Sequence, residues 1–186
     1  MLALGVFWSG FLKDMLCLPR PLSPPLKRIT MSHWTALEYG FPSTHSTNAV
    51  SVAVYFLYFL HTREIHLPNT LHITAVTVGY VYAISIIIGR LYCGMHGFFD
   101  VVVGSALGGL LAALQLLYGP SFDAWIMSGP WIRPALVTVI ILAAVRFHPE
   151  PADNCPCFDD SVAFAGVMIG VEVGDWHFAG LSLIHI

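Results

Sequence analysis

Long apolar runs separated by short polar segments recur along the whole chain, and one of them, AVSVAVYFLYFL, covers residues 49–60. Hydrophobic residues make up 56% of the 186 residues and charged residues only 10%, whereas soluble domains carry roughly 25% charged residues. A helix that crosses a membrane needs about 20 mostly apolar residues. The sequence therefore predicts an all-α, polytopic membrane helix bundle with about six spanning segments, the first of them partial.

The apolar runs also indicate where the helices begin and end. The segment 17–42 contains PRPLSPP, whose prolines oppose helix and favour an extended chain. We expect loops at 119–130 and 148–160. The run GSALGG, residues 104–109, places small residues at helical spacing, so we expect two helix backbones to approach closely there. The expected helices cover residues 1–14, 43–61, 69–90, 96–118, 131–147 and 161–176.

Both ends of the chain indicate a fragment. The first residues, MLALGVFWSGFL, are apolar but lack the basic start and the cleavage site of a signal peptide, so we interpret them as the end of a spanning helix. The last six residues, LSLIHI, match the translation of a sequencing adapter. We expect a single membrane domain over residues 1–180, truncated at its N-terminus, with adapter read-through at 181–186.

Charge and cysteine content exclude several classes. A net charge of −3 argues against a nucleic-acid partner. Cys155 and Cys157 have the wrong spacing for a structural zinc site, and four cysteines make no disulfide framework. We expect Cys17, Cys93 and this pair to be thiols that are buried or face lipid.

Successive spanning helices place their ends on alternate sides of a membrane. If the first helix leaves the membrane at Lys13, the second enters at Ser43 on the same side, and the third returns to that side at Arg90. The residues expected together at this surface are Lys13, Arg20, Ser43, His45, Arg90, His96 and Asp100.

The segment GRLYCGMHGFFD, residues 89–100, carries the strongest chemical pattern. His96 and Asp100 are four residues apart, so on one helix they would stack within hydrogen-bonding reach. A carboxylate that accepts from one ring nitrogen leaves the other free as a nucleophile or base. A structural ion pair at a helix end is the alternative for this pair alone. Arg90, beyond a bend allowed by Gly94, supplies a guanidinium that suits phosphate oxygens, although alone it would be an interfacial residue.

Two further segments add an anion site. Lys13 would by itself be an interfacial anchor, whereas Arg20 is held between two prolines. A helix that begins after Pro42 exposes free backbone N–H groups and its positive dipole end to an anion. Ser43 could act as a helix cap alone, and His45 could protonate a leaving oxygen.

These three segments resemble the motifs of the type-2 phosphatidic acid phosphatase superfamily. The pattern K-x6-R-P falls at residues 13–21, P-S-x-H at 42–45 and R-x5-H-x3-D at 90–100, in the order of the family. Thr44 replaces the usual glycine of the second motif but keeps its backbone N–H. Gly89 replaces the usual serine before Arg90, which removes one possible hydrogen bond to phosphate.

Within this superfamily, the segments at 13–30, 38–46 and 148–164 resemble the sphingosine and dihydrosphingosine 1-phosphate phosphatases, particularly the fungal type. The resemblance implies a multi-pass enzyme of the endoplasmic reticulum membrane that removes phosphate from sphingoid base phosphates without a metal, a cofactor or an obligatory protein partner. It implies His96 as nucleophile, Asp100 as its partner and His45 as general acid and base. The phosphate-binding residues would be Lys13, Arg20, Ser43, Thr44 and Arg90.

The orientation and the substrate leave alternatives. A literal count of basic residues places the motif face in the cytoplasm, whereas the resemblance places it in the lumen, and we follow the resemblance. A phosphatase acting on phosphatidate or isoprenoid diphosphates would carry the same motifs. An inactive scaffold or transporter would be expected to have lost a histidine or the aspartate, and His45, His96 and Asp100 are all present.

The remaining polar residues receive structural assignments. Asp14 and Glu38 are expected to be structural, and Glu172 and Asp175 are given no role. The other histidines considered, His33, His61, His66 and His72, are expected to be solvated or interfacial. The acidic residues Glu150, Asp153, Asp159 and Asp160 are expected on a solvated loop.

Overall fold

The structure, a computed structural model, describes residues 1–30, 34–62 and 67–184. Within these ranges it is entirely helical, with one 3₁₀ turn and no β-strand, which confirms the all-α prediction. The turn lies at Trp34–Ala36 in the long connection after the first helix. The helices are α1 (Leu2–Leu16), α2 (Thr44–Thr62), α3 (Asn69–Tyr92), α4 (Phe98–Met127), α5 (Ile132–Arg146) and α6 (Cys157–Ile184).

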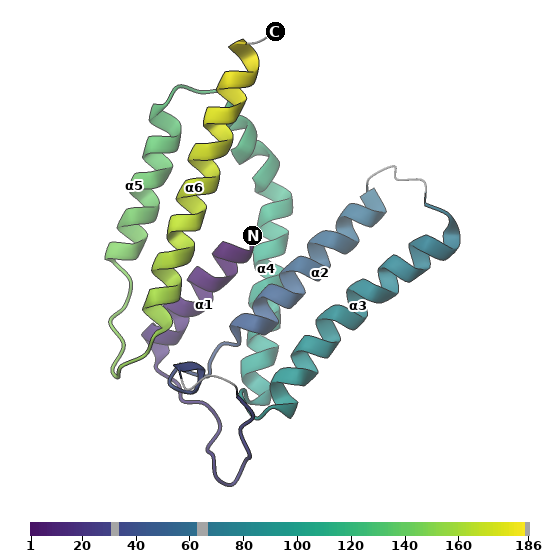
Figure 1. Cartoon of the computed structure of the whole chain (residues 1–186), viewed down its shortest axis with the longest axis vertical. Coiled ribbons are helices and arrows are strands. Elements are labelled where there is room, and N and C mark those ends of the chain that lie inside the picture. Colours follow the sequence, from purple (N-terminus) through teal and green to yellow (C-terminus); the bar gives the residue numbers. More distant parts are fainter. Residues whose placement is uncertain (31–33, 63–66, 185–186) are drawn as a thin grey trace.

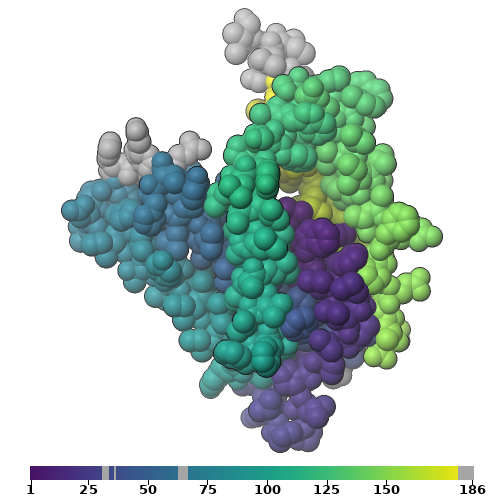
Figure 2. Space-filling view, turned by 180° about the vertical axis from the view of Figure 1, so that it is seen from behind, coloured from purple at the N-terminus to yellow at the C-terminus, as the bar shows by residue number. Residues whose placement is uncertain are grey.

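Helix α4 lies at the centre of the bundle and contacts α1, α2, α3 and α6 (Figure 1). Figure 2 shows α4 between two groups of helices, with α2 and α3 on one side and α1 and α5 on the other. Helix α6 packs against both α1 and α5. The lower end of the bundle in Figure 1 therefore gathers the end of α1, the start of α2, the end of α3 and the start of α4.

Two helices of the described part, α3 and α4, are long and apolar enough to cross a membrane. Large aliphatic side chains of α3 are more than half exposed, which would be unfavourable in water and suits contact with lipid. The other four helices do not meet the same test, because α1 and α5 have only 15 residues, α2 begins with a polar turn and α6 carries four carboxylates. The aliphatic side chains of α3 that are more than half exposed are Leu71, Ile73, Val78, Val81, Ile84 and Ile88.

Two of the expected loops are partly helical. Helix α4 continues to Met127 and includes Pro120, although a proline removes one helical hydrogen bond. Ile126 in this extension is completely buried, so packing offsets the cost of the proline. Helix α6 begins at Cys157, so Asp159 and Asp160 lie in its first turn, where carboxylates interact favourably with the helix dipole.

The small residues of α4 do allow close packing, as predicted. A Cβ atom added at Gly104 would lie 2.5 Å from the Ser43 carbonyl oxygen, and one added at Gly108 would lie 2.2 Å from that of Thr47. The hydroxyl of Thr47 uses this proximity to donate to the Gly104 carbonyl at 2.9 Å. The backbones of α2 and α4 are thus in close contact near the starts of the two helices.

The connection between α3 and α4 is a tight turn. Gly94 has a positive φ of 62°, a conformation that suits glycine, and this confirms the bend expected there. The Met95 amide donates to the Arg90 carbonyl at 3.2 Å across the turn. This turn brings the end of α3 next to the start of α4.

Candidate active site

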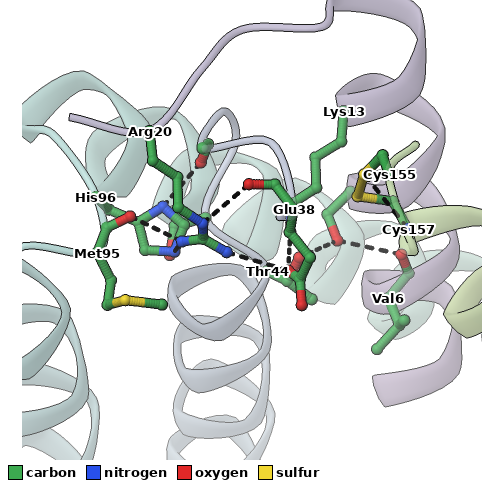
Figure 3. A network of polar contacts seen from close by, with 12 residues as sticks. Val6, Lys13, Arg20, Glu38, Thr44, Met95, His96, Cys155 and Cys157 are labelled. Carbon is green, nitrogen blue, oxygen red and sulfur yellow. Dashed lines mark hydrogen bonds and ion pairs between the residues drawn. A yellow bond between two sulfur atoms is a disulfide. The ribbon is translucent and has the colours of Figure 1, made fainter. Parts of the chain in front are cut away.

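Five segments come together at the lower end of the bundle in Figure 1: the end of α1, the connection after it, the start of α2, the end of α3 and the turn before α4. Lys13 lies in the last turn of α1 and Arg90 in the last turn of α3. His96 lies in the turn before α4, and Arg20 approaches it from the segment that follows α1. Figure 3 shows Arg20 between His96 and Glu38, with Lys13 on the far side of Glu38.

The imidazole of His96 is held at both nitrogens. Its Nδ1 lies 2.7 Å from the Gly40 carbonyl oxygen, and its Nε2 lies 3.2 Å from Nη1 of Arg20. A guanidinium only donates and a carbonyl only accepts. Therefore Nδ1 carries the proton and Nε2 presents its lone pair, which is the tautomer that a nucleophilic Nε2 needs.

Burial keeps this imidazole neutral. His96 is only 3% exposed. Burial, and then the positive charges of Arg20, Lys13 and Arg90, lower the pKa of His96 to about 2. The side chain is therefore uncharged at neutral pH, with an available lone pair.

Asp100 has a different place from the one expected. Helix α4 begins at Phe98 after an extended Gly97, so His96 precedes the helix and does not share a helical face with Asp100. The Asp100 carboxylate accepts from the Gly97 amide at 2.7 Å and caps the helix, while its Oδ2 lies 3.7 Å from His96 Nδ1. The closest acceptor for His96 is consequently Gly40, with Asp100 as a nearby charge.

Glu38 connects the two cations of the first motif. Its Oε2 atom lies 2.9 Å from Lys13 Nζ and 3.1 Å from Arg20 Nη2 (Figure 3). Its backbone carbonyl accepts from Arg20 Nε at 3.0 Å, and the Met95 carbonyl accepts from Arg20 Nη1 at 2.7 Å. Burial lowers the pKa of Arg20 to about 10, so this guanidinium stays charged at neutral pH.

The backbone of Gly40 contributes to the site, although it belongs to none of the three sequence motifs. The Gly40 amide donates to the Leu18 carbonyl at 2.9 Å, and a Cβ atom at Gly40 would lie 2.9 Å from both the Arg20 Cα and the Pro19 oxygen. Only a glycine permits this close approach, which places the Gly40 carbonyl against His96. The available signals were a glycine and the acid Glu38 immediately before the P-S-x-H motif.

The three residues predicted at the start of α2, Ser43, Thr44 and His45, lie in two different environments. Ser43 is completely buried, and its Oγ accepts from the Ser46 amide at 3.3 Å as a helix cap. Thr44 and His45 instead reach a small cavity of about 60 Å³. The first amides of a helix have no intrahelical partner and can bind an anion. The cavity is lined by Val6, Gly10, Lys13, Glu38, Thr44, His45, Cys157 and Asp160.

Arg90 has an unsatisfied donor. Its Nε atom is buried and has no hydrogen-bond partner among the residues that the structure describes. The charge of Arg90 acts on both His45 and His96. A buried N–H group without a partner is costly, so this donor is available to an anionic ligand.

The cysteines differ from expectation. Cys155 and Cys157 form a disulfide with Cα atoms 5.4 Å apart, so the prediction of four thiols is wrong for this pair. Cys17 and Cys93 are free. Sulfurs of the pair and a carboxylate oxygen of Asp14 lie within 4.8 Å of one another, a possible ligand group, but the sulfurs are bonded to each other.

Other polar residues lie apart from this cluster. The buried side chains of Asp14 and His148 are 3.6 Å apart, and His148 Nε2 is 3.1 Å from Ser161 Oγ. These enclosed groups offer no access to a substrate, so Asp14 remains a structural assignment. His61 and His72 contact each other where α2 ends and α3 begins, and His33 and His66 lie outside the described residues.

Comparison of the sequence with known proteins identifies a family. The model of the PAP2 superfamily matches residues 1–122, a range that contains all three motifs. This chain belongs to the PAP2 superfamily. Members of this superfamily are membrane proteins, in agreement with the apolar helices α3 and α4.

Individual relatives in the PAP2 superfamily agree with the family match. The chain is 41% identical to a dihydrosphingosine 1-phosphate phosphatase of Schizosaccharomyces pombe, over 100% of this chain and 45% of that protein. It is 37% identical to one of Saccharomyces cerevisiae, over 95% of this chain and 43% of the relative. Sphingosine-1-phosphate phosphatase 2 of Homo sapiens is 28% identical, over 89% and 40%. The chain thus spans less than half the length of these relatives, and no solved structure matches it.

Proposed function

We propose that the whole protein is a lipid phosphate monoester hydrolase that removes phosphate from sphingoid long-chain base 1-phosphates. The observation that carries the proposal is the neutral His96, whose Nε2 lone pair faces Arg20 within a group of cations. The names of the fungal relatives support the choice of substrate. The reaction is assigned no metal, no cofactor and no obligatory protein partner.

The proposed reaction has two steps. The bound phosphate dianion favours the protonated form of His45. His96 Nε2 attacks phosphorus, the bond from phosphorus to the lipid oxygen breaks, and protonated His45 gives its proton to that oxygen. The Arg20 N–H that contacts Nε2 turns to a phosphate oxygen as the new bond forms. His45 then takes a proton from water, whose oxygen attacks the phosphohistidine and releases inorganic phosphate.

The surrounding groups suit the charge that develops. Lys13, Arg20 and Arg90 would hold the equatorial phosphate oxygens, where charge accumulates in the transition state. The Thr44 amide and Ser43 at the start of α2 would add donors. Asp100, 3.7 Å from Nδ1, would stabilise the imidazolium of the phosphohistidine.

Phosphate release tests this proposal. The full-length protein in detergent micelles with EDTA is given dihydrosphingosine 1-phosphate or phosphatidate, beside His96→Ala, His45→Ala and the distant control His72→Ala. We expect metal-independent release that favours the sphingoid substrate, disappears in His96→Ala and falls about 100-fold or more in His45→Ala. Rapid quenching with labelled substrate should trap an acid-labile phosphoenzyme. Release that survives the loss of His96 would refute the mechanism.

We further propose that the protein lies in the endoplasmic reticulum membrane with its site facing the lumen. The α5–α6 connection shares the face of the site, because the Asp153 amide donates to the Tyr39 hydroxyl at 3.0 Å. A glycosylation acceptor inserted after Glu150 should therefore be glycosylated. An unmodified acceptor there, with one in the α4–α5 connection modified, would place the site in the cytoplasm.

A further inference from the structure

Two carboxylates line the cavity beside the candidate phosphate site. Glu38 and Asp160 share the cavity of about 60 Å³ with Lys13, Thr44 and His45. A phosphate is negatively charged, so carboxylates next to it weaken its binding unless a positive group lies between them. Lys13 and Arg20 already balance the charge of Glu38, so the exposed carboxylate of Asp160 is the group left to balance a positive charge that a ligand carries close to its phosphate.

The two carboxylates differ in their partners. Glu38 is only 18% exposed at its side chain and holds both Lys13 and Arg20 at hydrogen-bonding distance. Asp160 forms no ion pair with any residue in the described ranges, although the charges of Glu38 and Lys13 act on it. The helix dipole favours an acid at both position 159 and position 160 in the first turn of α6. The two side chains differ in where they lie, because Asp159 lines the separate pocket beside the α5–α6 connection. Asp160 is therefore the available carboxylate on the phosphate side.

We infer that Asp160, together with Glu38, binds the ammonium group of a sphingoid base phosphate. This inference rests on the proposed function. In such a lipid the phosphate ester and the ammonium are on adjacent carbons, so the group that binds the ammonium must lie next to the cations that bind the phosphate. Glu38 contacts two of those cations, and Asp160 lines the same cavity.

This arrangement matches the charges of the substrate. The dianionic phosphate faces Lys13, Arg20 and Arg90, and the ammonium faces the two acids. Phosphatidate has a phosphate but no ammonium, so the same acids disfavour it. Asp160 and Glu38 thereby act as specificity-determining residues, while the bond-breaking chemistry depends on His96.

A matched pair of substrates tests the inference. The full-length protein is assayed with dihydrosphingosine 1-phosphate and with octadecyl phosphate, which has the same chain length and phosphate but no ammonium. We expect Asp160→Asn to lower kcat/KM for the sphingoid substrate about tenfold, the effect of one charge-assisted hydrogen bond. Release from octadecyl phosphate should be unchanged or faster. The control Asp159→Asn, one residue away, should leave the ratio of the two kcat/KM values unchanged.

Each other outcome has a defined meaning. An equal fall for both substrates, or an unchanged ratio, overturns the ammonium site while His96-dependent release keeps the proposed function. Absence of release from either substrate by the wild-type protein, or release independent of His96, overturns both. If Asp160→Asn fails to fold, Glu38→Gln provides the test. It should lower kcat/KM for both substrates, because Glu38 holds Lys13 and Arg20, and it should lower kcat/KM for the sphingoid substrate more. Equal slowing of both substrates by Glu38→Gln would overturn the inference.

Discussion

The carbonyl oxygen of Gly40 lies 2.7 Å from Nδ1 of His96 and thereby determines which nitrogen of this histidine carries the proton and which presents its lone pair. A backbone carbonyl cannot take up a proton at neutral pH, so the orientation does not depend on the titration of a neighbouring acid. The contact also joins the segment before α2 to the turn before α4. A shift of the Gly40 backbone should therefore change the orientation of the His96 imidazole.

Gly40→Ala tests this contact. The added Cβ would lie 2.9 Å from the Arg20 Cα and the Pro19 oxygen, so the backbone must shift and move the carbonyl away from His96. We expect kcat to fall about 100-fold, the effect of a misplaced reacting group, with the protein still folded. Gly109→Ala is the control, because a Cβ there meets nothing within 4 Å. Full activity in Gly40→Ala would show that other groups orient His96.

Asp100→Asn separates the charge of this residue from its capping role. The amide oxygen of asparagine can still accept from the Gly97 amide, so the melting temperature should change little. The lost charge should lower kcat about tenfold, whereas Asp100→Ala should also lose about 1 kcal/mol of stability with the cap. Thermal unfolding and phosphate release on the same samples provide the comparison. An Asn variant with normal kcat would limit Asp100 to capping.

Arg90→Gln should weaken anion binding. The buried Nε of Arg90 has no partner among the described residues, so an oxyanion is its natural ligand. We expect the concentration of orthovanadate that halves phosphate release to rise about tenfold, the loss of one charge-assisted hydrogen bond. The exposed Arg146 at the end of α5 gives the control Arg146→Gln. Equal inhibition of all three proteins would exclude Arg90 from the phosphate site.

His96 should also affect stability in acid. Its pKa is lowered from an ordinary value of 6.5 to about 2, so the unfolded chain binds more protons than the folded one between these limits. The free energy of unfolding should therefore decrease as pH falls through this window, by roughly 1 kcal/mol per pH unit. In His96→Asn this contribution is absent, so melting temperatures measured at pH 7 and pH 5 should differ less than in the wild type. The control is Gly109→Ala, and equal differences in all three proteins would contradict a neutral buried His96.

Much of the fold follows from the sequence because apolar runs and membrane thickness leave few choices. The helices lie near the expected ranges, and the turn at Gly94 and the small residues of α4 behave as predicted. The loop expected at 119–130 is helical as far as Met127, because the burial of Ile126 offsets the cost of Pro120 inside the helix. The Cys155–Cys157 disulfide was missed because a single short spacing does not reveal pairing.

The candidate site was predictable only in its side chains. The motifs identify Lys13, Arg20, His45, Arg90 and His96 by residue type and order. The Gly40 carbonyl could not be read from the motifs, because every residue has a carbonyl and only the close approach to Arg20 gives this one a role. The double ion pair of Glu38 depends in the same way on tertiary placement.

The close contact between α2 and α4 also bears on how the site meets a changing bilayer. Gly104 and Gly108 pack against Ser43 and Thr47, and the Ser43 amide donates to the Asp100 carbonyl at 3.0 Å. A thicker or thinner membrane tilts helices, but these two must tilt as one body. The distance between His45 in the first turn of α2 and His96 before α4 should therefore not depend on lipid composition. The site can keep its geometry in membranes of different thickness.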